Sequence, residues 1–145
     1  MVKAPAFEGA LDLSVKISGC PNSCGQHHVA DIGFFGTNKR VGERDIPSYQ
    51  VLVGGSPEAG REYGIQIGRI PAKNAPEAFR TIVETYVRDR RGGERFYEFV
   101  RRLGRPAVAE ILRPFETAEG EEVAVDWGRS EAFAAPGKMK GECSA

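Results

Sequence analysis

The order of apolar and polar side chains changes along the chain, and the change falls near residue 75. Before it, residues 11–18 (LDLSVKIS) alternate between apolar and polar side chains, which is typical of a half-buried strand. Three more strand-like stretches follow, at residues 29–36, 48–55 and 63–70. We expect the second strand to end at Gly36, because the turn-like residues 37–39 come next.

After residue 75 the apolar positions recur with the period of a helix. A first helix is predicted from Pro76 onward, with an apolar face made by Phe79, Ile82, Val83, Tyr86 and Val87. Asn74 and Glu77 have the spacing of an N-cap and its capping-box partner. Two shorter helices are predicted next: one that stops at Gly104, and one that Pro106 opens.

Strands followed by helices indicate an α+β domain. We expect a mixed sheet of about four to five strands packed by two to three C-terminal helices. Residues 1–10 are interpreted as a leader or a boundary, residues 11–115 as the domain, and residues 116–145 as a tail. The tail shows no sustained period, so we expect it to pack locally through Trp127 and Phe133 and to be mobile elsewhere.

Composition narrows the class of protein. The chain has 145 residues, enough for one domain with its own core, and 20 basic side chains balance 20 acidic ones. This balance gives no reason to expect nucleic acid or a membrane surface as a partner. No apolar run is long enough to span a bilayer. Three cysteines do not make a disulfide framework, so we expect a reducing, cytoplasmic setting.

The chemistry-bearing side chains gather in residues 18–28 (SGCPNSCGQHH), which hold two of the three cysteines and both histidines. Cys20 and Cys24 follow the first predicted strand, and Asn22 and Gly25 favour a turn between and after them. Such a turn leaves backbone N–H groups unpaired, and these groups suit the sulfur atoms of an iron–sulfur cluster. The plainer interpretation is a pair of buried, reduced cysteines.

Zinc is a rival ligand for the same segment, since Cys20, Cys24, His27 and His28 could supply four donors. Adjacent histidines tend to point in different directions, and zinc motifs usually separate them by three or more residues, which argues against this site. Two other signals are weaker. Residues 54–56 (GGS) are either a small anion cradle or an ordinary strand-ending turn. Cys143 in the tail is interpreted as an incidental thiol.

The segment ISGCPNSCGQHHVADIGFFG, residues 17–36, closely resembles the second half of the cluster motif in siroheme-containing sulfite and nitrite reductases, particularly the ferredoxin-linked kind. The likeness continues in YQVLVGG, residues 49–55, which looks like the family's strand ending in a glycine pair. Residues 67–104 look like the segment that closes its C-terminal half. The resemblance covers about residues 11–115 and implies the fold of the family's 4Fe–4S domain.

The resemblance also implies a set of cofactors and roles. In the family, four cysteines in two pairs bind one [4Fe–4S] cluster, and the second pair matches Cys20 and Cys24. The last cysteine of that pair bridges the cluster to the siroheme iron, which implies this role for Cys24 and places Asn22 beside the cofactor. Electrons from ferredoxin or a similar donor then reduce sulfite to sulfide or nitrite to ammonia. No catalytic residue, and no role for His27 or His28, is assigned in this chain.

The chain departs from the family pattern before Cys20. The family's first pair, spaced Cys-x5-Cys, lies a few dozen residues upstream, whereas the nineteen residues before Cys20 contain no cysteine. We therefore expect a C-terminal fragment whose partner is the N-terminal remainder of a larger reductase. Alone it should be inactive and should not hold the cluster or siroheme. The alternatives are a small zinc-binding module, or a non-catalytic interaction domain derived from the same fold.

Overall fold

The structure is a computed structural model, and it describes residues 9–10, 12–58 and 62–134. Four strands form one sheet: β1 (Val15–Ser18), β2 (Ile32–Val41), β3 (Arg44–Val53) and β4 (Ile65–Pro71). Three helices follow them: α1 (Ala75–Asp89), α2 (Phe96–Leu103) and α3 (Arg105–Leu112). Short 3-10 turns lie at His27–Val29, Ala72–Asn74, Arg113–Phe115 and Glu121–Ala124.

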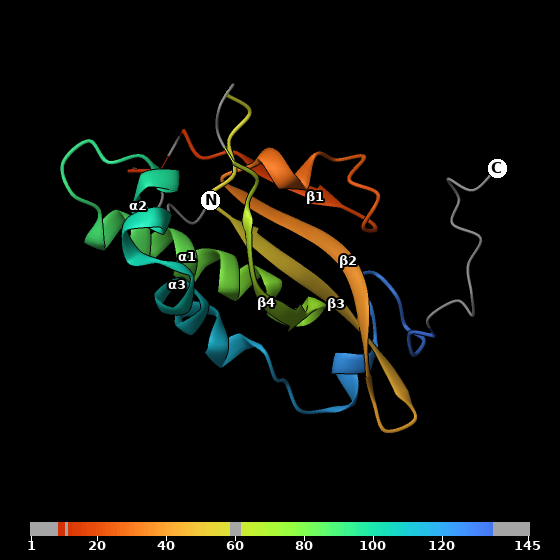
Figure 1. Ribbon diagram of the computed structural model, residues 1–145. Helices are drawn as coiled ribbons and strands as arrows, with labels where there is room; N and C mark the ends of the chain where they lie inside the picture. Colours follow the sequence, from red (N-terminus) through yellow and green to blue (C-terminus); the bar gives the residue numbers. More distant parts are fainter. Residues whose placement is uncertain (1–8, 11, 59–61, 135–145) are drawn as a thin grey trace.

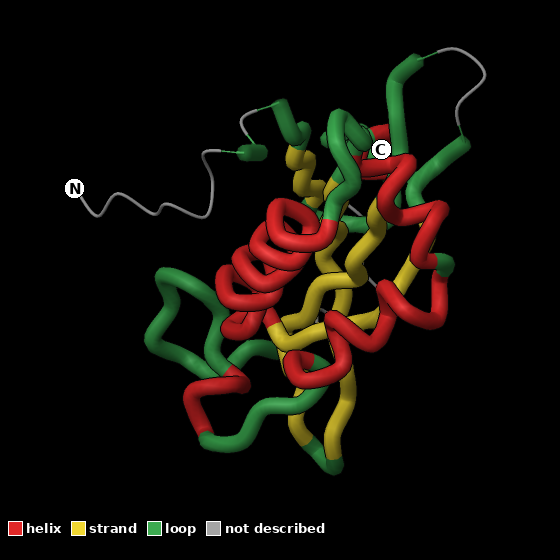
Figure 2. The backbone as a smooth tube through the Cα atoms, turned by 90° about the vertical axis from the view of Figure 1, so that its left-hand side faces the viewer, coloured by secondary structure: helices red, strands yellow, loops and turns green. Residues whose placement is uncertain are grey.

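The sheet is mixed, with its strands in the order β1-β2-β3-β4 (Figure 1). β1 runs parallel to β2, with Val15 opposite Ile32 and Ser18 opposite Phe35. The other two pairs of strands are antiparallel. The helices gather on one side of the strands, as the rotated view in Figure 2 shows. The α+β prediction of a mixed sheet packed by C-terminal helices is therefore confirmed.

The hydrophobic core lies between the sheet and the helices. β2 and β3 contribute alternate residues to it, because successive side chains of a strand point to opposite faces. The residues from the strands are Ile32, Phe34, Val51, Val53, Ile67 and Ile70. The residues from the helices are Ala78, Ile82, Val83, Tyr86, Phe96, Phe99, Val100, Val108 and Leu112. The predicted apolar face of α1 therefore packs on the sheet through Ile82, Val83 and Tyr86, while Phe79 and Val87 flank the core.

β2 extends beyond its predicted end. The sequence predicts a stop at Gly36 and a turn at residues 37–39, but these residues pair with Tyr49, Ser48, Pro47 and Ile46 of β3. The chain reverses instead after Val41, where Gly42 has a φ of 61° that favours glycine. The predicted end of β2 at Gly36 was wrong because polar residues do not by themselves end a strand. Cross-strand pairing with β3 holds these residues extended.

Asn74 precedes α1, as predicted, but its side chain does not cap the helix. The preceding 3-10 turn gives Asn74 helical dihedral angles (φ −87°, ψ −9°) instead of the extended ones that an N-cap residue needs. Its Nδ2 donates hydrogen bonds to the carbonyl oxygens of Phe115 (2.8 Å) and Thr117 (3.1 Å). The expected capping box with Glu77 is therefore wrong, and Asn74 ties the start of α1 to the chain after α3.

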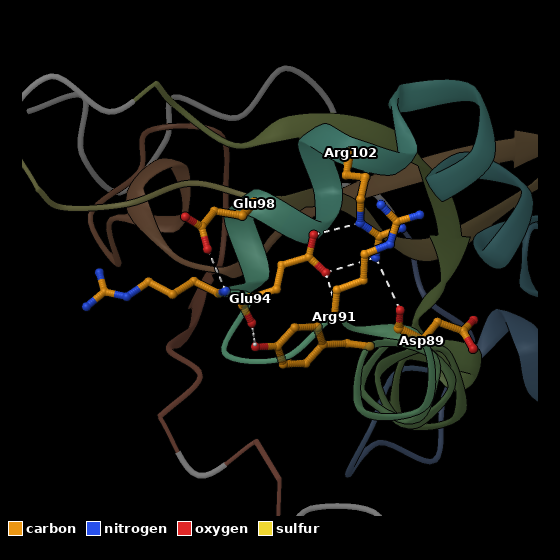
Figure 3. A network of polar contacts seen from close by, with 7 residues as sticks. Asp89, Arg91, Glu94, Glu98 and Arg102 are labelled. Carbon is orange, nitrogen blue, oxygen red and sulfur yellow. Dashed lines mark hydrogen bonds and ion pairs between the residues drawn. The ribbon is translucent and has the colours of Figure 1, made fainter.

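A closed network of charges stabilises the connection between α1 and α2 (Figure 3). Arg102 donates to both carboxylate oxygens of Glu94, at 2.6 and 2.8 Å, and the backbone N–H of Arg91 donates to the same carboxylate. Arg102 also reaches the carbonyl oxygen of Asp89, and the Tyr86 hydroxyl donates to the carbonyl of Glu94. The hydrogen bonds from Arg102, followed by the bond from the Arg91 N–H, lower the pKa of Glu94 to about 2.

The described part of the tail packs beside the start of α1. The indole Nε1 of Trp127 donates to the carbonyl oxygen of Ala72 at 2.9 Å, and the Lys73 ammonium lies 4.2 Å from the indole ring centre. Val125 and Ala132 form a short antiparallel bridge. Cys143 lies outside the described residues. None of the described helices is long and apolar enough to cross a bilayer.

Candidate functional site

The cysteines lie in the connection between the parallel strands β1 and β2. Phe34 points into the core beneath the helices, so its neighbour Phe35 points to the opposite face of the sheet. The imidazole of His27 packs against Phe35, with ring centres 4.8 Å apart. The connection therefore covers the face that the helices leave open. We call its residues 19–26 the cysteine turn.

The cysteine turn presents two free thiols. Cys20 is half-buried and Cys24 is exposed. Ser23 and Gln26, on either side of Cys24, have φ angles of 61° and 58°, a region that non-glycine residues seldom adopt. Within the described chain, the backbone N–H groups of Asn22 and Cys24 have no hydrogen-bond partner. The turn thus offers sulfur ligands together with unpaired donors.

Glycines in the neighbouring strand let the connection lie directly on the sheet. A Cβ atom at Gly33 would collide with the carbonyl oxygen of His27, and one at Gly36 with the carbonyl oxygen of Gly19. Gly55, which follows β3, lies in the same way against the carbonyl of His28. These three glycines were not among the site residues predicted from the sequence. The available signal was glycine inside a strand pattern, which marks a close approach of another backbone.

The two histidines have different surroundings. His27 is fully buried, and its Nδ1 lies 2.7 Å from the hydroxyl oxygen of Ser18. Burial lowers the pKa of His27, and the neighbouring His28 lowers it further. His28 is half-buried and lies 5.7 Å from the ring centre of Tyr63. The imidazole of His27 is therefore held in place by a hydrogen bond to Ser18 of β1.

The described residues form no cluster of three or more His, Cys, Asp or Glu side chains that could hold a metal ion. A zinc site made from Cys20, Cys24 and one histidine is therefore not assembled. The two cysteines fit one half of an iron–sulfur site instead, because they provide two of the four thiolates that a [4Fe–4S] cluster binds. The unpaired N–H groups of Asn22 and Cys24 fit the need of cluster sulfurs for donors.

The pair Gly54-Gly55 does not form an anion cradle. The N–H of Gly54 donates to the carbonyl oxygen of Asp31 at 2.8 Å, so it is not available to a ligand. Gly55 is buried against the carbonyl oxygens of His28 and Ala30, which would repel an anion. The second interpretation of this segment, a strand-ending turn, agrees with the structure.

An open cavity of about 430 Å³ lies beside the cysteine turn. Gly19 forms part of its wall, and Tyr49, Ser48, Asp126 and Phe133 form other parts. No lysine or arginine is found among the described residues that line it. The lining of this cavity therefore provides no basic group that would hold an acidic cofactor.

The chain is similar to known proteins over most of its length. The sequence model described as "Nitrite and sulphite reductase 4Fe-4S domain" matches residues 13–117. An assimilatory ferredoxin-dependent nitrite reductase of Haloferax mediterranei is 34% identical over 106 residues, which cover 72% of this chain and 18% of that protein. A sulfite reductase [NADPH] hemoprotein beta-component of Methylobacterium nodulans is 33% identical over 93 residues, or 64% of this chain and 14% of that protein.

Among solved structures, the NirA protein of Mycobacterium tuberculosis matches with a TM-score of 0.60 and 29% sequence identity. The match covers 72% of this chain and 20% of the NirA chain. The chain thus spans about a fifth or less of the length of these relatives. The family match includes the cysteine turn, all four strands and all three helices. The chain belongs to the nitrite and sulphite reductase 4Fe–4S domain family.

Proposed function

We propose that this chain supplies the second cysteine pair of a [4Fe–4S] cluster in a siroheme-dependent sulfite or nitrite reductase. One observation carries the proposal: Cys20 and Cys24 are free thiols in a turn of this family's 4Fe–4S domain. The remaining two thiolates would come from the N-terminal remainder of the reductase. In this proposal the chain binds and orients cofactors and provides no catalytic residue.

The exposure of the two thiols supports different roles for them. A ligand shared between a cluster and the siroheme iron has to reach a second metal on its open side. Cys24 is exposed and Cys20 is half-buried, so Cys24 is the better candidate for the bridge. Asn22 is exposed between them, and its unpaired N–H can donate to a cluster sulfur. A bridging thiolate would couple the two centres electronically because one sulfur is bonded to both.

When bound, the cluster and siroheme would carry electrons to sulfite or nitrite. Relatives are named as ferredoxin-dependent and as NADPH-linked enzymes. We infer a ferredoxin-like donor for this protein, which follows the first of these relatives. Two free thiols persist in a reducing compartment, so a cytoplasmic location fits the site.

The test is anaerobic purification of the natural polypeptide that carries this segment, followed by iron, sulfide and siroheme analysis. We expect siroheme absorption and about four cluster irons per chain. Cys20→Ser and Cys24→Ser should each lose most of the cluster iron. Cys143→Ser is the matched control, and it should keep the iron. Residues 1–145 alone, treated anaerobically with iron and sulfide, should bind less than one cluster per chain because two ligands are missing.

Three results would overturn the proposal. The first is full iron content in Cys20→Ser or Cys24→Ser, which would remove these residues from the ligand set. The second is a colourless protein that carries one zinc ion, which would favour the small zinc-binding module. A colourless, metal-free protein that folds equally well without either thiol would favour an interaction domain derived from the reductase fold.

A further inference from the structure

Two buried side chains join the ends of the cysteine turn. Ser18 is the last residue of β1, and His27 begins the 3-10 turn that leads to β2. The Ser18 hydroxyl oxygen accepts the backbone N–H of Gly25 at 3.1 Å and lies 2.7 Å from Nδ1 of His27. One hydroxyl therefore links β1 to the residue that follows Cys24 and to the residue where the turn ends.

The hydrogen-bond pattern assigns the tautomer of His27. If Nδ1 carried the proton, it would donate to Ser18, whose hydroxyl proton would then have no acceptor among the described residues. If Nδ1 is unprotonated, the Ser18 hydroxyl donates to it and accepts from Gly25, so both of its bonds are satisfied. The ring proton then lies on Nε2. The assignment agrees with the lowered pKa of His27, which favours a neutral ring.

The other ring nitrogen is buried without a partner. Nε2 of His27 is the one buried side-chain nitrogen or oxygen, among the described residues that are not exposed, that makes no hydrogen bond. The ring packs instead between Phe35 and His28, with centre-to-centre distances of 4.8 and 4.2 Å. An unsatisfied buried donor destabilises a fold, because it has lost its hydrogen bonds to water. A phenyl ring would fill this space without that cost, so the nitrogen that bonds to Ser18 needs an explanation.

We propose that Ser18 and His27 are positioning residues for the cysteine turn. The neutral imidazole orients the Ser18 hydroxyl, and that hydroxyl fixes the N–H of Gly25, so the backbone around Cys24 has one shape before any metal arrives. The importance of this shape for a cluster rests on the proposed function above. The hydrogen bonds themselves are present in the metal-free chain and are tested there.

Amide hydrogen exchange at Gln26 separates positioning from simple packing. The Gln26 N–H donates to the carbonyl of Ser23 at 2.7 Å, inside the turn. This bond involves neither Ser18 nor His27, the two residues to be substituted. Ser18→Ala and His27→Phe should each lower its protection by about tenfold, which corresponds to the loss of one hydrogen bond. Ser18→Thr keeps the hydroxyl and should retain the protection.

Matched controls use neighbours of the same type. Ser48 is also a buried strand serine, but its hydroxyl donates to the carbonyl of Ile46, and His28 adjoins His27 without bonding to Ser18. Ser48→Ala and His28→Phe should change Gln26 protection by less than about twofold. Exchange at Val51 in β3 reports global unfolding in every variant. A change at Gln26 counts only when Val51 protection is unchanged.

The ring nitrogens provide a measurement that needs no substitution. Nitrogen-15 NMR of the metal-free chain should show the His27 proton on Nε2 at neutral pH. A proton on Nδ1, or equal Gln26 protection in Ser18→Ala and Ser48→Ala, would overturn the proposal. Neither result depends on iron. If Cys20 and Cys24 do not bind a cluster, the iron and sulfide analysis will show it, while the Gln26 exchange and the His27 NMR measurement stay the same.

Discussion

Two polar connections, the one between α1 and α2 and the cysteine turn, differ in whether their reactive or charged side chains find partners within the described chain. In the connection between α1 and α2, the carboxylate of Glu94 receives two hydrogen bonds from Arg102 and one from the backbone of Arg91. In the cysteine turn, both thiols are free and the N–H groups of Asn22 and Cys24 are unpaired. The charged side chain at the centre of the first connection finds its partners within the chain, whereas the two thiols of the second do not.

This difference separates a structural role from a functional one. Polar groups that satisfy one another hold two helices at a fixed angle and need nothing further. Polar groups left open in a turn whose backbone is pressed onto the sheet are available to a ligand. The comparison thus supports a ligand site at the cysteine turn and argues against one in the arginine-rich segment 88–102, although that segment carries more charge.

The largest effect on stability is expected where the connection between β1 and β2 lies in direct contact with the sheet. Gly33→Ala places a methyl group against the carbonyl oxygen of His27, and backbone atoms must move. We expect the free energy of unfolding to fall by about 1–3 kcal/mol, measured by urea denaturation. Gly93→Ala in the α1–α2 connection is the matched control, since open space surrounds that position. Equal stability of the two variants would show that the turn is not seated on β2.

Glu94→Gln tests how much the charge network of the α1–α2 connection contributes to stability. The variant loses the charge that two Arg102 donors and the Arg91 N–H share, so its melting temperature should fall by more than that of Glu110→Gln. Glu110 is a suitable control because its ion pair with Arg113 is exposed on both sides, at 65% and 71%. An equal loss in both variants would contradict a special role for the network.

The pH dependence of the same carboxylate has a definite sign. The pKa of Glu94 falls from 4.5 to about 2 on folding, so its stabilising contribution is complete above pH 4.5. That contribution should be lost as the pH falls through the window from 4.5 toward 2. Acid titration followed by circular dichroism should show this loss in the unsubstituted chain and a smaller one in Glu94→Gln. Parallel acid curves for the two proteins would refute the assignment.

His27 should give a smaller effect of the same kind at higher pH. Burial lowers its pKa below 6.5, so the unfolded chain binds a proton that the folded chain excludes. Stability is therefore expected to decrease as the pH falls below about 6.5, toward the lower pKa of the folded state. Melting temperatures between pH 7.5 and 5.5 should show a decline that His27→Phe lacks and His28→Phe keeps. A decline that persists in His27→Phe would assign it to another group.

The smallest effect on folding is expected at the thiols. Cys24 is exposed and forms no bond within the described chain, so Cys24→Ser should change the free energy of unfolding by less than about 0.5 kcal/mol. Urea denaturation of the metal-free chain measures this. A loss above 1 kcal/mol would mean that the thiol is part of the fold, and it would weaken the contrast between the two connections.

Much of the architecture could be predicted from local patterns. Alternation located β1, although its apolar residues Val15 and Ile17 are exposed in the structure. Helical spacing located α1, because one face of that helix is buried and the other is not. The end of β2 could not be predicted in this way. Its residues 37–41 are extended by pairing with residues 44–48 of β3 across the hairpin, a contact outside the strand itself that polar residues do not indicate. Asn74 was misassigned for a related reason, since its partners lie beyond α3.

The sequence located the two thiols and the turn that holds them, but not the contacts that support this turn. The motif around Cys20 and Cys24 indicated an iron–sulfur ligand pair from spacing and resemblance, and that assignment stays a prediction. The bond between Ser18 and His27 could not be inferred, because it depends on how the connection folds back across β2. Gly33 and Gly36 carried a readable signal, but only the structure shows which backbone approaches them.

The parallel pairing of β1 with β2 has a consequence for the order of assembly. β2 and β3 form a tight hairpin that can close early, because its ends are near in sequence. β1 can dock only when the whole segment between Ser18 and Ile32 has closed into a loop, which is entropically costlier and slower. The turn that holds the thiols is that loop. We therefore expect the two cysteines to reach their final geometry only after the β2–β3 hairpin has closed, and metal insertion to follow that step.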